Sequence, residues 1–363
     1  MSRILVLATT PPNYRTSDRG LARPPALCQS VGMTGSTLTI GSVSIGMRAL
    51  IAPMSGVSDL PFRRAAARQG ARYVVTEMVA ADQLARGRPD VVQRAAIEGL
   101  PLNIVQLVGR EARWIGLGAK MAEEAGADII DLNMGCPSRE VVGVACGAAL
   151  MRDLDHAESL IDAAVNATSR PVTLKMRLGW DDGSRNAPEL AERAEKAGVK
   201  AITVHARTRN QFYKGICDWR AVAEVKSAIR LPVIVNGDIA DDISARTALS
   251  QSGADAVMVG RAACGRPWIA AAIDQALNNN APMREPSMTE RLAIALEHLS
   301  DTIAFYGERF GVRVFRKHLA AYVEQAPFPE SAEERRAAKA RLCQLSGPAA
   351  VERELANLWR AGT

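Results

Sequence analysis

The sequence predicts an α/β protein in which a (β/α)8 TIM barrel is followed by a small all-α helical domain. Eight short apolar runs alternate with helical patterns through the middle of the chain, as in a barrel built from eight β/α units. Four helical stretches end in a glycine that precedes a small residue and an apolar run, at Gly70, Gly126, Gly198 and Gly253. Glycine there supplies the left-handed residue that ends a helix.

The eight predicted strands are apolar almost throughout, as expected for parallel strands covered on both faces. An open doubly wound sheet is the alternative arrangement of such units. It is disfavoured because no GxGxxG motif follows the first strand. The predicted strands are Ala49–Ala52, Tyr73–Glu77, Asn103–Val108, Ile129–Asn133, Val172–Arg177, Ala201–His205, Val233–Asn236 and Ala256–Val259.

Strand signals stop at about Pro286, and four helices are predicted beyond it, with Pro327 and Pro329 marking a break. We therefore expect a barrel domain over residues 38–284 and a helical domain over residues 285–363. Residues 1–37 lack periodicity, and we expect a disordered or non-native extension there, with the functional chain beginning at or near Met33. The predicted helices are Thr289–Tyr306, Val312–Gln325, Ala332–Leu345 and Ala349–Ala361.

The amino-acid composition excludes only a few classes of protein. The net charge is +6 over 363 residues, which fits a soluble protein with a basic surface or one that binds a polyanion such as RNA. No run of about eighteen apolar residues predicts a membrane span. The six cysteines form no CxxC pair and the chain has only four histidines, so we expect no metal site and a reducing cytoplasmic setting. We also expect a monomer.

Polar residues follow or interrupt the predicted strands at positions where a TIM barrel collects its chemistry. Gly237 and Gly260 allow backbone N–H groups to approach a phosphate, and Arg261 adds positive charge. The alternative is two ordinary tight turns. The candidate site residues at or near these strand ends are Pro53, Met54, Ser55, Gln106, Asn133, Cys136, Lys175, Arg177, His205, Arg207, Asn236, Gly237, Asp238, Gly260 and Arg261.

Three of these residues are candidates for chemistry. Lys175 in a barrel strand is costly unless an anion meets it, and a reduced flavin is such an anion; the alternative is an outward-facing side chain. Cys136, between Gly135 and Pro137, is a candidate nucleophile or general acid, or else a small buried hydrophobe. His205 is a candidate ligand for a phosphate or carbonyl, or a core histidine.

Further motifs occur in a consistent order along the chain, and their combination resembles the tRNA-dihydrouridine synthase family, most closely its bacterial B-type. The resemblance covers nearly everything after about Leu38. The motifs are Ile51–Met54, Ser58–Arg63, Asp131–Pro137, Gly147–Met151, Thr173–Arg177, His205–Arg209, Pro232–Ile239, Gly260–Ala263, Gly265–Trp268 and, in the tail, Arg316–His318 with Tyr322.

The resemblance implies that NADPH, or alternatively NADH, reduces FMN, and that hydride then passes to C6 of a uridine in the tRNA D-loop while Cys136 protonates C5. It implies that Pro53, Met54 and Ser55 contact the flavin ring, that Gln106 and Lys175 bind its polar edge, and that His205 lies beside it. It assigns the ribityl phosphate to Asn236, Gly237, Asp238, Gly260 and Arg261. It assigns tRNA to Asn133, Arg177, Arg207, Arg316 and Lys317.

Two residues depart from the family pattern. Glu140 stands where the family usually has lysine, and Ala206 replaces a glycine after the histidine. Two other functions remain open, namely a flavin barrel that reduces a free pyrimidine and a non-catalytic RNA-binding protein. The helical tail disfavours the first, and the presence of both Cys136 and Lys175 disfavours the second.

Overall fold

The computed structural model describes residues 38–328 and 331–360. The expectations for residues 1–37, including a start near Met33, lie outside this range, as do Pro329 and Ala361. No helix in the described part of the chain is long and apolar enough to cross a membrane.

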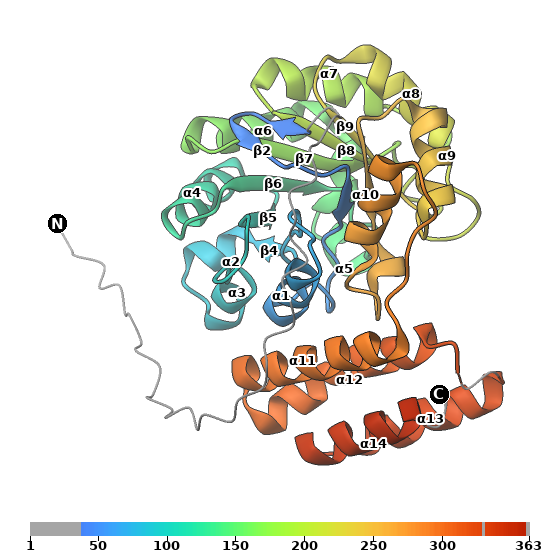
Figure 1. The fold of residues 1–363 in the computed structure, drawn as a ribbon. Coiled ribbons are helices and arrows are strands. Elements are labelled where there is room, and N and C mark those ends of the chain that lie inside the picture. The colour runs from blue at the N-terminus through green and yellow to red at the C-terminus, as the bar shows by residue number, and fades with distance from the viewer. Residues whose placement is uncertain (1–37, 329–330, 361–363) are drawn as a thin grey trace. The chain divides into compact units, whose positions relative to one another are not determined.

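The barrel predicted from the sequence is confirmed (Figure 1). Its strands form a parallel sheet in the order β3-β10-β9-β8-β7-β6-β5-β4. Each strand except β4 is buried along most of its length, because helices cover the outer face and side chains fill the inside. The strands are β3 (Ala49–Ile51), β4 (Val79–Ala80), β5 (Ile104–Val108), β6 (Ile129–Met134), β7 (Val172–Arg177), β8 (Ala201–His205), β9 (Val233–Asn236) and β10 (Ala256–Val259).

The second predicted strand, Tyr73–Glu77, differs from the expectation. The chain there makes only isolated parallel bridges, from Val74 to Ile51 and from Val75 to Ile104. These two bridges join β3 to β5 and close the barrel. Continuous strand pairing resumes only at β4, which pairs with β5. The apolar pattern therefore predicted the position of this segment correctly, but the segment forms fewer strand hydrogen bonds than a regular strand would.

Helices connect the strands and pack on the outside of the barrel (Figure 1). All four glycines predicted to end helices have positive φ, at +99° (Gly70), +97° (Gly126), +104° (Gly198) and +65° (Gly253). A short hairpin of β1 (Thr39–Ile40) and β2 (Val43–Ser44) precedes the barrel. The barrel helices are α1 (Leu60–Arg68), α2 (Ala81–Ala85), α3 (Pro89–Arg94), α4 (Ala112–Glu124), α5 (Arg139–Val142), α6 (Leu154–Ala167), α7 (Ala187–Ala197), α8 (Trp219–Ala228), α9 (Asp242–Ser252) and α10 (Ile269–Asn279), with 3-10 helices η1 (Gly147–Arg152) and η2 (Arg261–Ala263).

The C-terminal region is helical, as predicted, and has its own apolar cluster, in which Phe315, Leu342, Leu355 and Trp359 are buried. Its helices are α11 (Met288–Tyr306), α12 (Glu308–Gln325), α13 (Ala332–Gln344) and α14 (Pro348–Arg360). Helix α12 begins four residues earlier than Val312, because Gly307 alone separates it from α11. Arg68 of α1 forms ion pairs with Glu297 (3.0 Å) and Asp301 (2.5 Å) of α11, which tie this region to the barrel.

Candidate active site

A cleft of about 920 Å³ opens at the C-terminal ends of the barrel strands. Parallel strands in a closed barrel deliver their final residues to one face, so side chains far apart in sequence meet there. The volume is in the range of small-molecule and cofactor sites. Predicted site residues that line it are Pro53, Met54, Ser55, Asn133, Cys136, Lys175, Arg177, His205, Arg207, Asn236, Gly237, Asp238, Gly260 and Arg261.

A line of buried hydrogen bonds crosses strands β5, β6 and β7 below the cleft. The Thr173 hydroxyl donates to one oxygen of Asp131 (2.6 Å), and the Gln106 amide nitrogen donates to the other (2.6 Å). The Asn133 amide nitrogen then donates to the Gln106 oxygen (2.7 Å). Because Gln106 uses both ends of its amide within this line and does not line the cleft, the structure places it beneath the site.

The same line positions Cys136. The Asn133 side-chain oxygen accepts the backbone N–H of Gly135 (3.2 Å) and of Cys136 (3.0 Å). Behind the loop, Gly147 has φ +60°, and a Cβ there would lie 2.8 Å from the Cys136 carbonyl oxygen and 3.2 Å from its Cβ. Backbone and side chain thus fix the thiol from two sides.

Burial raises the pKa of the Cys136 thiol, although a Ser138 backbone hydrogen bond and the charges of Arg177 and Lys175 act in the opposite direction. A raised pKa keeps the sulfur protonated at neutral pH, since even an unperturbed thiol titrates near 8.5. The thiol is therefore in the form of an acid and not of a thiolate nucleophile.

Lys175 points its ammonium into the cleft and donates to the Asn236 side-chain oxygen (3.0 Å). Asn236 is held in turn by donating to the Met258 carbonyl (2.7 Å). Burial lowers the pKa of Lys175 to about 8, with Asp131 acting in the opposite direction. At neutral pH the side chain therefore remains mostly a cation, and an anion in the cleft would stabilise that form.

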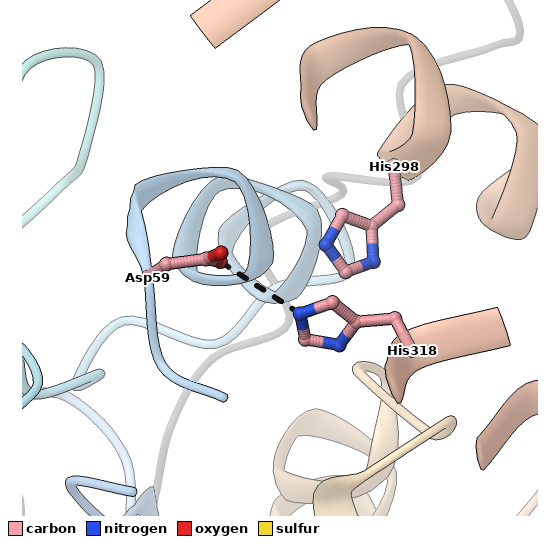
Figure 2. A group of neighbouring side chains, drawn as sticks. All are labelled: Asp59, His298 and His318. Atoms are coloured by element: carbon pink, nitrogen blue, oxygen red, sulfur yellow. Dashed lines mark ion pairs between the residues drawn. The ribbon is translucent and has the colours of Figure 1, made fainter. Parts of the chain in front are cut away.

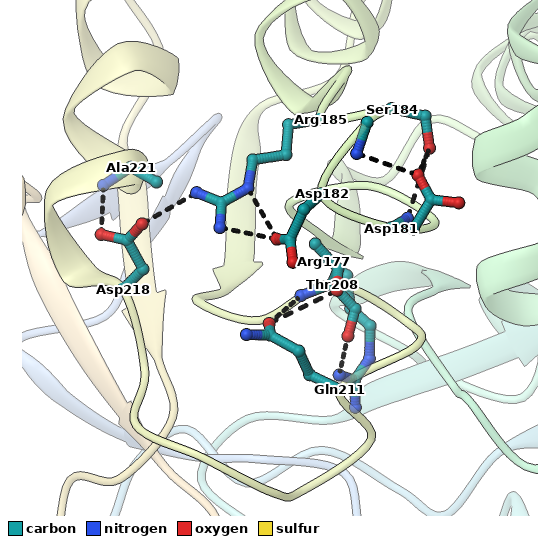
Figure 3. Close-up of polar contacts among 10 residues, drawn as sticks. Arg177, Asp181, Asp182, Ser184, Arg185, Thr208, Gln211, Asp218 and Ala221 are labelled. Atoms are coloured by element: carbon teal, nitrogen blue, oxygen red, sulfur yellow. Dashed lines mark hydrogen bonds and ion pairs between the residues drawn. The ribbon is translucent and has the colours of Figure 1, made fainter.

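Two arginines beside the cleft, Arg177 and Arg207, donate hydrogen bonds to backbone carbonyls of the surrounding loops. Arg177 donates to the carbonyls of Gly135 (2.7 Å), Thr208 (2.9 Å) and Phe212 (2.9 Å). Figure 3 shows Arg177 next to Thr208 in the loop after β8, where the Gln211 side-chain oxygen accepts the Thr208 N–H. Arg177 therefore ties the loop that carries Cys136 to the loop that follows β8.

Arg207 is buried and donates to the carbonyls of Lys214 (3.1 Å) and Gly215 (2.6 Å). It also pairs with Asp238 (2.6 Å), whose other oxygen lies 3.3 Å from Arg261. Burial alone would raise the pKa of Asp238, but the hydrogen bond and charge of Arg207 bring it below its usual value. Asp238 thus stays ionised and orients both guanidinium groups.

His205 completes the wall between these cations. Burial, with the charges of Arg177 and Lys175, lowers the pKa of His205 well below its ordinary value. The imidazole is therefore neutral and adds no positive charge. Gly237 packs directly against it, with φ +115°, and a Cβ at that position would lie 2.3 Å from the Cys217 sulfur and 2.9 Å from the His205 ring.

Comparison with known proteins decides the family. A family model described as Dihydrouridine synthase (Dus) matches residues 50–356. A Rhodobacter capsulatus protein named "Probable tRNA-dihydrouridine synthase" is 51% identical over 83% of this chain and 94% of its own length. The tRNA-dihydrouridine synthase B of Pseudomonas aeruginosa is 41% identical over 80% of this chain and 88% of its own length. The chain belongs to the dihydrouridine synthase family. It is accordingly a flavin-dependent oxidoreductase that acts on a CH–CH bond.

The fold is shared more widely. The structure of morphinone reductase superposes with a TM-score of 0.51 at 16% identity, over 70% of this chain and 92% of that one. At this identity the likeness shows the barrel fold alone.

Some residues that the sequence assigned to tRNA lie away from the cleft of this dihydrouridine synthase. On α12, an Arg316 guanidinium nitrogen lies 3.5 Å from the Leu345 carbonyl. Lys317 lies 3.8 Å from the Asp59 carboxylate. Neither lines the cleft, so their assignment to tRNA stays a prediction about a separate surface.

Sequence reasoning gave no role to several residues at the site. Tyr213 lines the cleft, and its ring lies 5.6 Å from the Arg177 guanidinium and 5.1 Å from that of Arg261. Tyr213 lies in a loop without hydrophobic periodicity, so no sequence signal pointed to it. Asp131, whose pKa burial raises to about 6, carried a signal, namely a carboxylate inside an apolar strand. Glu140, noted only as a departure, lines the cleft beside Cys136.

The packing of Gly237 generates a prediction. We expect Gly237→Ala to destabilise the protein by about 1–3 kcal/mol, because the new methyl group collides with Cys217 and the positive φ strains any other residue. Chemical denaturation measures the change. Gly347→Ala is the matched control, since no atom lies within 4 Å of its Cβ position. Equal stability of the two variants would contradict the packing described for the loop after β9.

Proposed function

We propose that this chain reduces a uridine in the tRNA D-loop to dihydrouridine, with FMN as its flavin and NADPH as its reductant. The names of the relatives support tRNA and the reduction of uridine. The single observation in the structure that carries the proposal is the place of the Cys136 thiol at the wall of the cleft, on a backbone that Asn133 holds. A tRNA substrate favours a cytoplasmic location. We also propose that the protein is a monomer in which residues 38–284 are catalytic and residues 285–363 bind tRNA.

The residues of the cleft fit FMN. Gly237 and Gly260 leave the backbone open to a phosphate, and Arg261 lies beside them with its side chain 63% exposed. Lys175 supplies a cation near Asn236 for the polar edge of the ring. Bound FMN would supply the hydride for the uracil ring. A cation beside the flavin favours its reduced form, which is the contribution we assign to Lys175.

The remaining step falls to the protein. Hydride added at C6 of uracil leaves negative charge that a proton at C5 must quench, and Cys136 Sγ–H is positioned to give that proton. A uridine in folded tRNA must leave its stack to reach the cleft. Asn133 holds the Cys136 loop, so it orients the acid whether or not it also contacts the uracil.

Flavin binding should depend on Arg261 and Lys175 in different ways. Arg261→Ala should weaken FMN binding by about 10–100-fold, because it removes a charged hydrogen bond to phosphate. Lys175→Met should chiefly lower the flavin reduction potential and slow reduction by NADPH. Lys214→Met, which removes an exposed lysine from the loop after β8, should change neither. Normal flavin content and potential in both cleft variants would refute these assignments.

The thiol gives the sharpest test of the function. Cys136→Ala should fold, bind flavin and accept electrons from NADPH at the wild-type rate, since those steps do not use the thiol. Reoxidation of the reduced flavin by tRNA should slow by about 10²–10⁴-fold, the usual contribution of a positioned acid. Stopped-flow absorbance measures both half-reactions.

Cys146→Ala is the control, because Cys146 lies ten positions further on and its sulfur contacts the Val144 carbonyl (3.6 Å). It should be reoxidised nearly as fast as the wild type. Slow reoxidation of the Cys146 variant together with fast reoxidation of the Cys136 variant would show that Cys146, and not Cys136, donates the proton. Two fast variants would argue against the proposed reaction.

Binding of tRNA should use the basic face of α12. Each phosphate contact releases counterions, so the affinity should fall steeply with salt. Arg316→Ala with Lys317→Ala should reduce the slope of log affinity against log salt by about 2 if both side chains contact phosphate. Lys120→Ala, an exposed residue of α4, should leave the slope unchanged. An unaltered slope in the double variant would place the RNA surface elsewhere.

A further inference from the structure

A second cluster of functional side chains lies where the barrel meets the helical region, and the reaction proposed above does not use it. Asp59 caps the N-terminus of α1, His298 lies in the middle of α11, and His318 lies on α12. Figure 2 shows the two imidazole rings next to each other, with the Asp59 carboxylate facing the His318 ring. All three side chains are buried, with exposures of 3%, 0% and 2% respectively.

Each histidine has one unpaired ligand atom in this cluster, and Asp59 contributes Oδ1, which also accepts the Phe62 backbone N–H (3.1 Å). The Nε2 atoms of His298 and His318 are buried and have no hydrogen-bond partner. One ligand atom from each of the three residues lies within 4.8 Å of the other two. The Asp59 Oδ1 atom is 3.9 Å from the His318 Nε2 atom. Two buried polar atoms without partners are unusual in a native protein, because each loses its hydration without compensation.

Neighbouring side chains orient all three residues of the cluster. The His298 Nδ1 atom lies 3.1 Å from the Tyr322 hydroxyl, a contact that orients the ring as outer partners do for metal-binding histidines. The Asp59 Oδ2 atom faces the Tyr306 hydroxyl (3.4 Å) and Lys317 (3.8 Å). Phe62 stacks on His318 with ring centroids 5.7 Å apart, which fixes the second imidazole.

We propose that Asp59, His298 and His318 bind one divalent transition-metal ion, with Zn²⁺ the preferred ion. Two imidazoles and one carboxylate are a common donor set for zinc, and three protein ligands leave a fourth position for water. Imidazole nitrogen selects zinc over magnesium and calcium, which prefer oxygen ligands. The sequence spacing predicted no metal, because these ligands come from three separate segments that only the fold brings together.

The geometry requires small adjustments. Zinc binds nitrogen and oxygen at about 2.0–2.2 Å, so two ligand atoms of one tetrahedral ion lie about 3.4 Å apart. The Asp59–His318 separation of 3.9 Å must therefore close by about 0.5 Å, and the other separations, all within 4.8 Å, by at most about 1.4 Å. Lys317 competes for Asp59, and the ion would have to outweigh that cation. A bound ion would cross-link α1 to α11 and α12, and so fix the helical region against the barrel.

Cobalt and zinc titrations of the full-length, flavin-bound, untagged protein test the site. One equivalent of Co²⁺ should give the visible absorption bands of a four-coordinate site, and Zn²⁺ should abolish them and raise the unfolding temperature. His298→Gln and His318→Gln should lose both responses, whereas His156→Gln should keep them, since His156 lies on α6 outside the cluster. No bands and no thermal shift in the wild type, or responses that survive both cluster variants, would overturn the proposal.

A further variant tests the site without removing a ligand, in case the histidine variants fail to fold. Lys317→Met should tighten Zn²⁺ binding by about ten-fold, because it removes the cation that competes for Asp59. Unchanged or weaker binding would overturn the proposal. Both readouts measure metal alone, so the outcome is independent of whether the chain acts on tRNA.

Discussion

The buried line of hydrogen bonds from Thr173 through Asp131 and Gln106 to Asn133 is the interaction on which the site depends. It runs across three adjacent strands whose register sets Gln106 opposite Asp131 and Asn133 opposite Lys175. A buried polar network is stable only when each member is paired, so the strands cannot slip without leaving amides unsatisfied. The last member of the line, Asn133, holds the backbone of Cys136. The hydrogen bonds inside the barrel therefore help to position Cys136, the side chain to which we assign proton transfer.

Charge organises the rest of the cleft. Arg177 and Arg207 are buried and donate to loop carbonyls, so they hold the loops after β6 and β8 in place, and Arg207 also pairs with Asp238. Lys175 and Arg261 remain available to an anion, one within the cleft and one at its exposed edge. Asp238 stays ionised between two arginines, and His205 stays neutral. The cleft is therefore positive where a phosphate and an electron-rich ring would lie, while the thiol beside it remains protonated.

The sequence predicted the barrel well because apolar runs and helix-ending glycines are local signals. Strands such as Val172–Arg177 and Val233–Asn236 agree with the structure to the residue. Most of the residues predicted for the site line one cleft, since strand ends in a barrel converge. The sequence could not show which polar atoms pair with each other. Gln106 stays a predicted cofactor ligand, and no sequence signal indicated that its amide also pairs with Asp131 and Asn133. The grouping of Asp59, His298 and His318 was equally hidden, because it depends on how α11 and α12 pack against α1.

The central claim is that this cleft reduces a uridine presented by tRNA and not a free pyrimidine. The most direct measurement is anaerobic reoxidation of the reduced flavoprotein, followed by flavin absorbance, with unmodified tRNA or uridine added as the only acceptor. The account predicts rapid reoxidation by tRNA, formation of dihydrouridine in that tRNA, and negligible reoxidation by uridine. Equal reoxidation by free uridine, or none by tRNA, would contradict it.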